Sequence, residues 1–436
     1  MLSVLLAGSL FLSGCGDLTV PDFNNPSLED LENNPTPTGV ATATTGLLVG
    51  ARANLVAPNA YISLLGILGR ESYNLDEAEP RFVTEMLVGP MSPSGAFGGN
   101  LWTARYANIR NANIILNALD QVGGFSEAEK EAIRGFAKTI QALDYLLVIN
   151  SRDSNGAVID VNRPLSEEPG AIEPKEAVFA HTAGLLDEAQ GHLQAAGASF
   201  PFALSSGFDG FDTPAAFVAF NRALKARVDV YTANYEAALQ SLEGSFINTA
   251  TSLDRGVYHT YGTGSGETPN NLIAATIRAH PSLETNAQDQ PGGQPDQRLQ
   301  DKVAEVELRT QLGVGSDLGF TVYPSNTAPV PVVSNEELIL LRAEARWFTD
   351  DAAGALQDLN LIRQQAGGLA PIGTPGSDDA FITALLYERT YSLLFEGHRW
   401  LDYRRFGRLG SLPLDQPTHT VQTAFPIPEA EQLARQ

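Results

Sequence analysis

The densest group of charged residues lies near the C-terminus and has the side chains that acid–base chemistry would need. Seven acidic and basic residues fall between positions 388 and 405, among apolar and aromatic neighbours. On one continuous helix Glu388 and Glu396 would be about 11–12 Å apart, which is wider than the carboxylate pair of a glycosidase. Because an arginine fork satisfies a carboxylate with two hydrogen bonds, we expect ion pairs that lock the last helix to its neighbours. The group comprises Glu388, Arg389, Glu396, Arg399, Asp402, Arg404 and Arg405.

A second reactive group is Cys15, the only cysteine in 436 residues. It ends the sequence Leu-Ser-Gly-Cys and follows an apolar run over residues 2–12, which is too short to span a bilayer. Small residues before the cysteine suit cleavage by a signal peptidase, and the freed thiol can carry a thioether-linked diacylglycerol. The pattern predicts a bacterial lipoprotein signal over residues 1–15, with membrane attachment through lipid alone.

Other chemistry has little support in the sequence. The six histidines are scattered, and no His-Glu-x-x-His or Gly-x-Ser-x-Gly motif occurs. The glycine-rich run at 262–266 lacks the Lys-Ser/Thr of a phosphate-binding loop. A net charge of -23 argues against a nucleic-acid partner, whose phosphates the chain would repel. We therefore expect no enzyme activity, no cofactor and no metal site built from histidine or cysteine. A Ca²⁺ ion held by loop carboxylates and carbonyls stays open as an alternative, although no loop has the EF-hand spacing.

The elements that must hold these residues are predicted to be helices. Apolar residues recur at three and four spacing along much of the chain, whereas few segments alternate with a period of two. The expected helices cover residues 39–57, 101–120, 127–150, 174–196, 213–230, 234–246, 335–348, 351–366 and 378–396. The fold class is therefore mainly α.

An internal repeat indicates how these helices pair. Residues 224–242 align without a gap on residues 341–359, and Ala, Thr, Gln and Leu positions coincide. Each copy reads as a helix, a short turn and a second helix whose Ala-Leu pair packs back on the first. Small alanines at the crossing allow close approach, which is typical of a tetratricopeptide-like helical hairpin.

Two stretches interrupt the helical pattern, at about residues 66–100 and 247–330. They are rich in glycine and proline, which do not continue a helix. Long irregular segments inside a compact protein are often functional, so we expect insertions that face a ligand. Residues 16–38 are rich in proline, asparagine and acids and are expected to form an extended tether between the lipid and the folded body.

Aromatic residues on such insertions could stack on the faces of sugar rings while polar neighbours bind hydroxyl groups. Trp102 also fits a core position at helical spacing, and each of the others could simply pack within its own loop. We expect at least two of Tyr73, Tyr258 and Tyr261 to line one exposed site. The aromatic candidates are Tyr73, Phe97, Trp102, Tyr258 and Tyr261, with Asn74, Asp76, His259 and Asn270 as polar companions.

Several segments, taken in order, resemble the SusD/RagB family. Residues 336–345 with 355–363 are similar to its closing helical hairpin, and Phe395-Glu-Gly-His-Arg-Trp-Leu-Asp-Tyr-Arg-Arg405 is similar to its most distinctive stretch. Phe425-Pro-Ile-Pro-Glu429 resembles its terminal segment. Residues 247–330 match no part of the family pattern.

The resemblance implies a lipid-anchored protein on the outside of the outer membrane. It would capture a nutrient, commonly an oligosaccharide, and pass it unchanged to a SusC-like TonB-dependent β-barrel transporter. The implied fold is a single domain over residues 39–436, an array of tetratricopeptide-like helical hairpins with irregular excursions. Two alternatives remain at this stage: a scaffold that docks peptides or assembly factors in a helical groove lined with Asn, Lys and Arg, and a lipid-anchored hydrolase.

Overall fold

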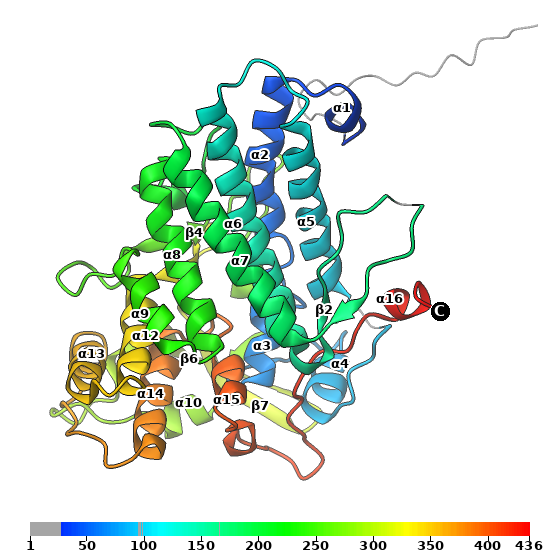
Figure 1. The fold of residues 1–436 in the computed structure, drawn as a ribbon. Helices are drawn as coiled ribbons and strands as arrows, with labels where there is room; N and C mark the ends of the chain where they lie inside the picture. The colour runs from blue at the N-terminus through cyan, green and yellow to red at the C-terminus, as the bar shows by residue number, and fades with distance from the viewer. Residues whose placement is uncertain (1–27, 95–96, 98, 165) are drawn as a thin grey trace, which may run out of the picture.

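The computed structural model describes residues 28–436 apart from 95–96, 98 and 165 (Figure 1). The predicted signal, Cys15 and the tether up to residue 27 lie outside the described residues. Residues Leu28–Asn33 form helix α1, although an extended tether was expected there. Leu31 is buried in the main core, which explains the difference, since this segment packs on the folded body. None of the described helices combines the length and apolar character needed to cross a membrane.

Nine helices match the nine expected ranges to within a few residues, which confirms the mainly α fold. Local capping fixes several of their starts. Ser126 and Glu129 form a capping box at one helix, and Thr213 with Pro214 begins another. The nine are α2 (Pro37–Arg52), α5 (Asn100–Ala118), α6 (Glu127–Arg152), α7 (Lys175–Ala195), α8 (Pro214–Tyr231), α9 (Tyr235–Glu243), α12 (Asn335–Trp347), α13 (Ala352–Gln365) and α14 (Asp378–Ser392).

Shorter helices fill the remainder of the fold. They are α3 (Tyr61–Leu68), α4 (Arg81–Val83), α10 (Ser282–Thr285), α11 (Gln297–Lys302), α15 (Arg399–Arg405) and α16 (Glu429–Leu433). In Figure 1 α15 lies close to the lower ends of α7 and α8, although it comes near the end of the chain.

The internal repeat corresponds to two helical hairpins of the same design, α8–α9 and α12–α13. The hydroxyls of Thr232 and Thr349 both donate to carbonyls three and four residues earlier. The next residue is left-handed in each copy, with φ of 57° at Ala233 and 63° at Asp350. Helices α9 and α12 pack together, so the two hairpins stack as the repeat predicts.

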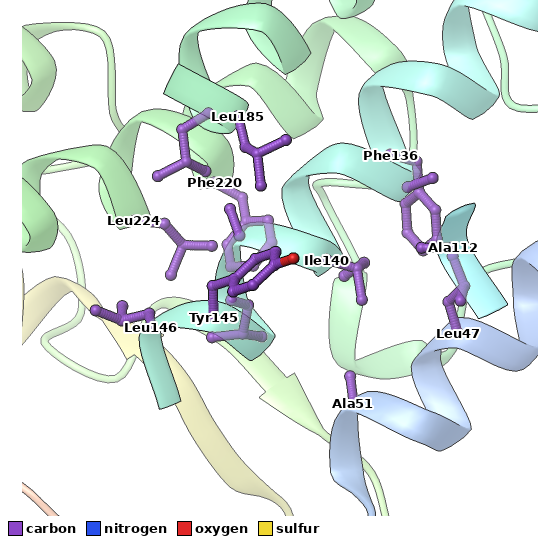
Figure 2. Close-up of a cluster of buried hydrophobic side chains, with 14 of the residues drawn as sticks. Leu47, Ala51, Ala112, Phe136, Ile140, Tyr145, Leu146, Leu185, Phe220 and Leu224 are labelled. Atoms are coloured by element: carbon purple, nitrogen blue, oxygen red, sulfur yellow. The ribbon is translucent and has the colours of Figure 1, made fainter. Parts of the chain in front are cut away.

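The largest core cluster lies among α2, α5, α6, α7 and α8. Figure 2 shows Phe136, Ile140 and Tyr145 of α6 between side chains of α2 and α5 on one side and of α7 and α8 on the other. A second cluster surrounds α3 and α15, and a third joins α12, α13 and α14. Helix α6 is therefore the central support of the N-terminal half.

Strands of the described residues form small antiparallel pairs, and three of these pairs involve the two predicted insertions while the pair formed by residues 157–158 and 172–173 lies outside them. The pairs are β1 (Ser72–Asn74) with β5 (Ile277–Ala279), β2 (Ala157–Val158) with β3 (Ile172–Glu173), β4 (Gly256–His259) with β8 (Val330–Ser334), and β6 (Val303–Gln311) with β7 (Val314–Phe320). The region 247–330 is thus less irregular than expected. Its alternating apolar and charged residues over 303–309 and the left-handed Leu312-Gly313 turn are hairpin signals, whereas an irregular segment was expected there.

Candidate functional site

The loop residues expected to bind a ligand do not gather at one exposed surface. Tyr73 and Tyr261 belong to the second core cluster and are only 3% and 8% exposed, so Tyr258 alone of the three tyrosines is partly open. Tyr73 is buried because β1 pairs with β5, and its ring lies 4.8 Å from that of His280. Phe97 stacks on Phe82 in the same core.

The polar companions mostly serve the fold. Asn270 donates to the carbonyl of Ala328 and accepts from the amide of Leu272, and Asn74 donates to the carbonyl of Pro58. Burial lowers the pKa of His259 to about 3, so this side chain is neutral. Asp76 is partly exposed and Trp102 is buried beside Tyr106, with ring centroids 4.5 Å apart. Most of the candidate residues are therefore buried within the fold, and Tyr258 and Asp76 are the partly exposed ones.

The C-terminal charged residues form ion pairs, several with partners outside their own group. Arg389 Nε lies 2.7 Å from Asp402 Oδ2, and both side chains are buried. Burial opposes ionisation of Asp402, but Arg389 and Arg405 hold its pKa below the ordinary value. Glu388 pairs instead with two arginines from earlier segments, Arg298 at 2.7 Å and Arg363 at 2.8 Å.

The rest of the group departs from the expected pattern. Helix α14 ends at Ser392 and Phe395 is left-handed, so Glu388 and Glu396 do not share one helix. Glu396 has no arginine or lysine partner among the described residues, and burial raises its pKa to about 8. Arg399 donates to the carbonyl of Arg70 rather than to a carboxylate.

A cleft of about 650 Å³ lies where α7, α8 and α15 meet, and we call it the α7–α15 cleft. Its size suits a ligand of several sugar units, since small-molecule sites span about 300–1,000 Å³. Helix α6 contributes its C-terminal end, and the turn between α8 and α9 forms the rim. The polar and ring residues that line it are Asn150, Asp153, Lys175, Glu176, Phe179, Lys225, Asp229, Tyr231, Asn234, Arg404 and Arg405.

Charges in the α7–α15 cleft are fixed by their neighbours. Lys225 Nζ donates to both oxygens of Asp229, at 2.7 and 3.0 Å. Asp153 Oδ1 lies 3.2 Å from Lys175 Nζ and 3.4 Å from Arg404 Nε. Because Asp153 and Asp229 already have cations beside them, these two carboxylates and their partners present acceptors and donors in fixed positions.

Arg404 and Arg405 connect this cleft to distant parts of the chain. Arg404 Nη2 donates to the carbonyl of Asn150 at 2.7 Å. Arg405 Nη2 lies 2.5 Å from Glu344 of α12, and its Nε lies 3.0 Å from Asp402. Arg405 therefore joins α15 to the α12–α13 hairpin and also lines the cleft, while Arg404 joins α15 to the end of α6.

Two aromatic rings flank these polar groups. Phe179 and Tyr231 are both half-buried and line the cleft. The guanidinium of Arg405 lies 5.3 Å from the centre of the Tyr231 ring. Burial raises the pKa of Tyr231 above its ordinary value, so its hydroxyl keeps its proton and can donate. Rings beside fixed hydrogen-bonding groups are suited to holding a polyhydroxylated molecule without changing it.

Few of the residues that line this cleft stand out in the sequence. Arg404 belonged to the charged C-terminal group and Tyr231 to the internal repeat, but neither was assigned to a ligand. The walls come from residues near 150, 175, 230 and 404, and no local pattern marks such a meeting of distant segments.

Comparisons with known proteins agree with this architecture. Residues 328–433, from the approach to β8 through α16, match the SusD family. No curated protein matches the chain. Because the matched segment includes α15, it supplies Arg404 and Arg405 to the α7–α15 cleft.

Solved structures extend the likeness to nearly the whole chain. A SusD superfamily protein from Bacteroides vulgatus gives a TM-score of 0.70 at 14% identity, over 91% of this chain and 97% of that one. A SusD-like carbohydrate-binding protein from Bacteroides fragilis gives 0.70 at 15%, over 93% and 99%. Surface glycan-binding protein A from Bacteroides thetaiotaomicron, solved with laminarihexaose, gives 0.69 at 14%, over 92% and 98%. Two of these three neighbours are described as carbohydrate-binding or glycan-binding proteins.

Proposed function

We propose that this chain binds an oligosaccharide in the α7–α15 cleft and delivers it to a transporter, because residues 328–433 match the SusD family and the fold resembles those of SusD-like proteins. The observation that carries this proposal is the cleft itself, where paired charges stand beside the rings of Phe179 and Tyr231. A sugar hydroxyl can accept from Lys175 and donate to Asp153 at once, while C–H faces of the sugar contact a ring.

The pairing of charges favours a neutral ligand over an anionic one. Lys225 and Arg405 each already contact a carboxylate, so a second carboxylate would have to displace Asp229 or Glu344. Removing a partner from a buried pair is costly. A neutral glycan adds hydrogen bonds without breaking these pairs.

The binding test begins with the full chain on a glycan array, followed by calorimetric titration of the best-bound oligosaccharide. Laminarihexaose is a reasonable first probe because a structural neighbour was solved with it. Phe179→Ala and Asn234→Ala should each weaken binding by roughly tenfold, since each removes a contact from the cleft. Asn234 is exposed and its side chain does not cap α9, so its loss should leave the fold intact.

Tyr258→Ala is the matched control, because Tyr258 is an aromatic on β4 that does not line the cleft. Unchanged affinity in Tyr258→Ala with loss in the cleft variants supports the α7–α15 cleft. Loss of affinity in Tyr258→Ala with unchanged affinity in the cleft variants would instead indicate that the ligand binds at the loop aromatics.

We further propose that Cys15 carries the lipid that anchors the protein in the outer membrane, facing outward. Support comes from the sequence before Cys15 and from the family. Metabolic labelling with palmitate should mark the wild-type protein, and Cys15→Ala should lose the label and enter the soluble fraction. A Cys15→Ala protein that still takes up the label would contradict lipidation at Cys15.

The delivery step requires a partner, which we propose to be a SusC-like TonB-dependent β-barrel. The match of residues 328–433 to the SusD family supports this assignment. A gene for such a barrel beside this one, and co-purification of the two proteins from membranes, are the expected findings. If the protein purifies alone and no barrel gene adjoins it, the delivery role fails while the glycan-binding role can still stand.

A further inference from the structure

A second hollow of about 440 Å³ lies on the other side of α7. It runs between α5, α6 and α7 and is bordered by the segment after β2, so we call it the α5–α7 groove. On α7 it is lined by His181 and Leu185, whereas the cleft is lined by Phe179 and Ala183. Residues two apart lie about 200° from each other around a helix, so the two hollows use opposite faces of α7.

Primary amides distinguish the α5–α7 groove. Gln141 donates to Asn113 Oδ1 at 2.6 Å and to the carbonyl of Ile109 at 3.2 Å, and this fixes both amides. Across the groove, Asn117 and Asn162 bond to each other at 3.2 Å. The bond from Gln141 uses the oxygen of Asn113 and leaves the amide nitrogen of Asn113 as a donor for a ligand. Four amides on three segments therefore present the donor and acceptor groups that match a peptide backbone.

Two cations stand one helical turn apart on α6. Arg134 Nη2 lies 3.2 Å from Asp120, and Lys138 Nζ lies 2.7 Å from Glu188. The side chains of Asp120 and Glu188 are 77% and 60% exposed, in contrast to the buried partners in the cleft. Arg134 also pairs at 2.7 Å with Glu131, whose side chain is 22% exposed, and this second pair holds the guanidinium in place. Because exposed ion pairs contribute little stability, an incoming carboxylate can replace Asp120 or Glu188 at low cost.

The groove lacks an open ring on which a sugar could stack, among the residues that the structure describes. Its one aromatic side chain besides the histidines is Tyr145, which is only 2% exposed and lies edge-on to His181 with centroids 4.9 Å apart. The hydroxyl of Tyr145 donates to the carbonyl of Ile159. This chemistry favours a peptide over a glycan.

We propose that the α5–α7 groove binds an extended peptide segment that ends in, or carries, a carboxylate. The amides of Asn113 and Asn117 bond the peptide backbone, and Arg134 with Lys138 binds the carboxylate. The site is separate from the glycan site of the cleft and does not depend on it.

The test selects peptides from a randomised hexapeptide library with free C-terminal carboxylates, using the full chain as bait. The best binder is then labelled and titrated by fluorescence anisotropy. Lys138→Ala and Asn113→Ala should each reduce its affinity by roughly tenfold, since each removes a hydrogen bond to the ligand. Asn111→Ala is the matched control, because Asn111 is on the same helix but does not line the groove.

The expected result is loss of affinity in the two groove variants and none in Asn111→Ala or Phe179→Ala. The proposal is overturned if selection yields no peptide that titrates, or if the selected peptide binds Lys138→Ala and Asn113→Ala as well as the wild type. Competition by a glycan that binds the cleft would also overturn it. Glycan binding should survive in Lys138→Ala. If peptide binding is absent while the glycan still binds, the peptide proposal fails and the proposed glycan-binding function stands.

Discussion

The α7–α15 cleft and the α5–α7 groove share one helix but place their charges in different surroundings. In the cleft, Lys225 and Asp229 are 10% and 4% exposed. In the groove, Asp120 is mostly exposed beside Arg134. Buried pairs fix the shape of a site because breaking one leaves an uncompensated charge, whereas exposed pairs exchange partners readily. The comparison suggests a rigid site for a neutral ligand and an adaptable one for a charged ligand.

The largest expected difference between the two regions concerns stability. Asp229→Ala leaves Lys225 buried without its main partner and should lower the free energy of unfolding by about 3–5 kcal/mol. Asp120→Ala in the groove should cost less than about 1 kcal/mol. Urea unfolding of both variants measures the contrast. Adding Lys225→Met to Asp229→Ala should recover much of the loss, and equal losses in the two single variants would break the comparison.

Ionic strength should separate the two binding reactions. Raising salt from about 0.05 to 0.5 M should weaken peptide binding several-fold, because the groove cations are exposed and therefore screened. The affinity of the cleft for a glycan should stay nearly constant over the same range, since a neutral ligand carries no charge for the salt to screen. Anisotropy and calorimetric titrations at matched temperatures provide the measurement. A steeper salt dependence for the glycan than for the peptide would contradict this assignment.

The fall in the free energy of unfolding at low pH should come more from the groove side of α7 than from its cleft side. Burial lowers the pKa of His181 below its ordinary value of 6.5, so the unfolded chain binds more protons there as the pH falls. The stability that neutral His181 contributes is complete above about pH 6.5 and is lost below it. His181→Gln should flatten the fall in unfolding free energy between about pH 7 and pH 5.

The control for this experiment is Phe179→Ala on the cleft side of α7. It removes packing but no titrating group, so its stability curve should run parallel to that of the wild type. A His181→Gln curve that is also parallel would show that this histidine is not responsible.

The smallest expected effect is at the rim of the cleft. Ala233 has a φ of 57°, a conformation in which a Cβ atom is strained, so Ala233→Gly should stabilise the fold by about 0.5–1 kcal/mol. Asp350 occupies the equivalent turn of the second hairpin, and Asp350→Gly should give a smaller gain because Asp tolerates this region better. Thermal unfolding of the two variants tests the order. A loss of stability in Ala233→Gly would show that the turn is not strained.

Sequence patterns predicted the helices well because their information is local. Apolar spacing and caps such as Ser126 with Glu129 act within a few residues. The two copies of the internal repeat also share the same turn conformation. The ligand residues were harder to predict. Tyr73 is buried by pairing with a strand about 200 residues later, so its loop position gave no guide to its exposure.

The cleft could not be predicted from sequence for the same reason. Lys175 begins a helix whose pattern indicates only an amphipathic surface, and its contact with Asp153 depends on where α6 ends. Arg404 was expected in an ion-pair group, yet it also bonds to Asn150 and so joins α15 to the end of α6. Amphipathic patterns show which face of a helix is buried but not which distant residue it meets.

The bond from Arg404 to Asn150 spans 254 residues and so has a consequence for the order of folding. The α5–α7 groove is made of helices that follow one another, and its walls are complete once residue 195 has been synthesised. The α7–α15 cleft has to wait for residue 405, because α15 forms one wall. Contacts this distant in sequence close late and slowly. During synthesis the apolar and charged wall of α7 that faces the cleft therefore stays open for most of the time the chain takes to emerge, which makes this wall the natural surface for a chaperone to cover.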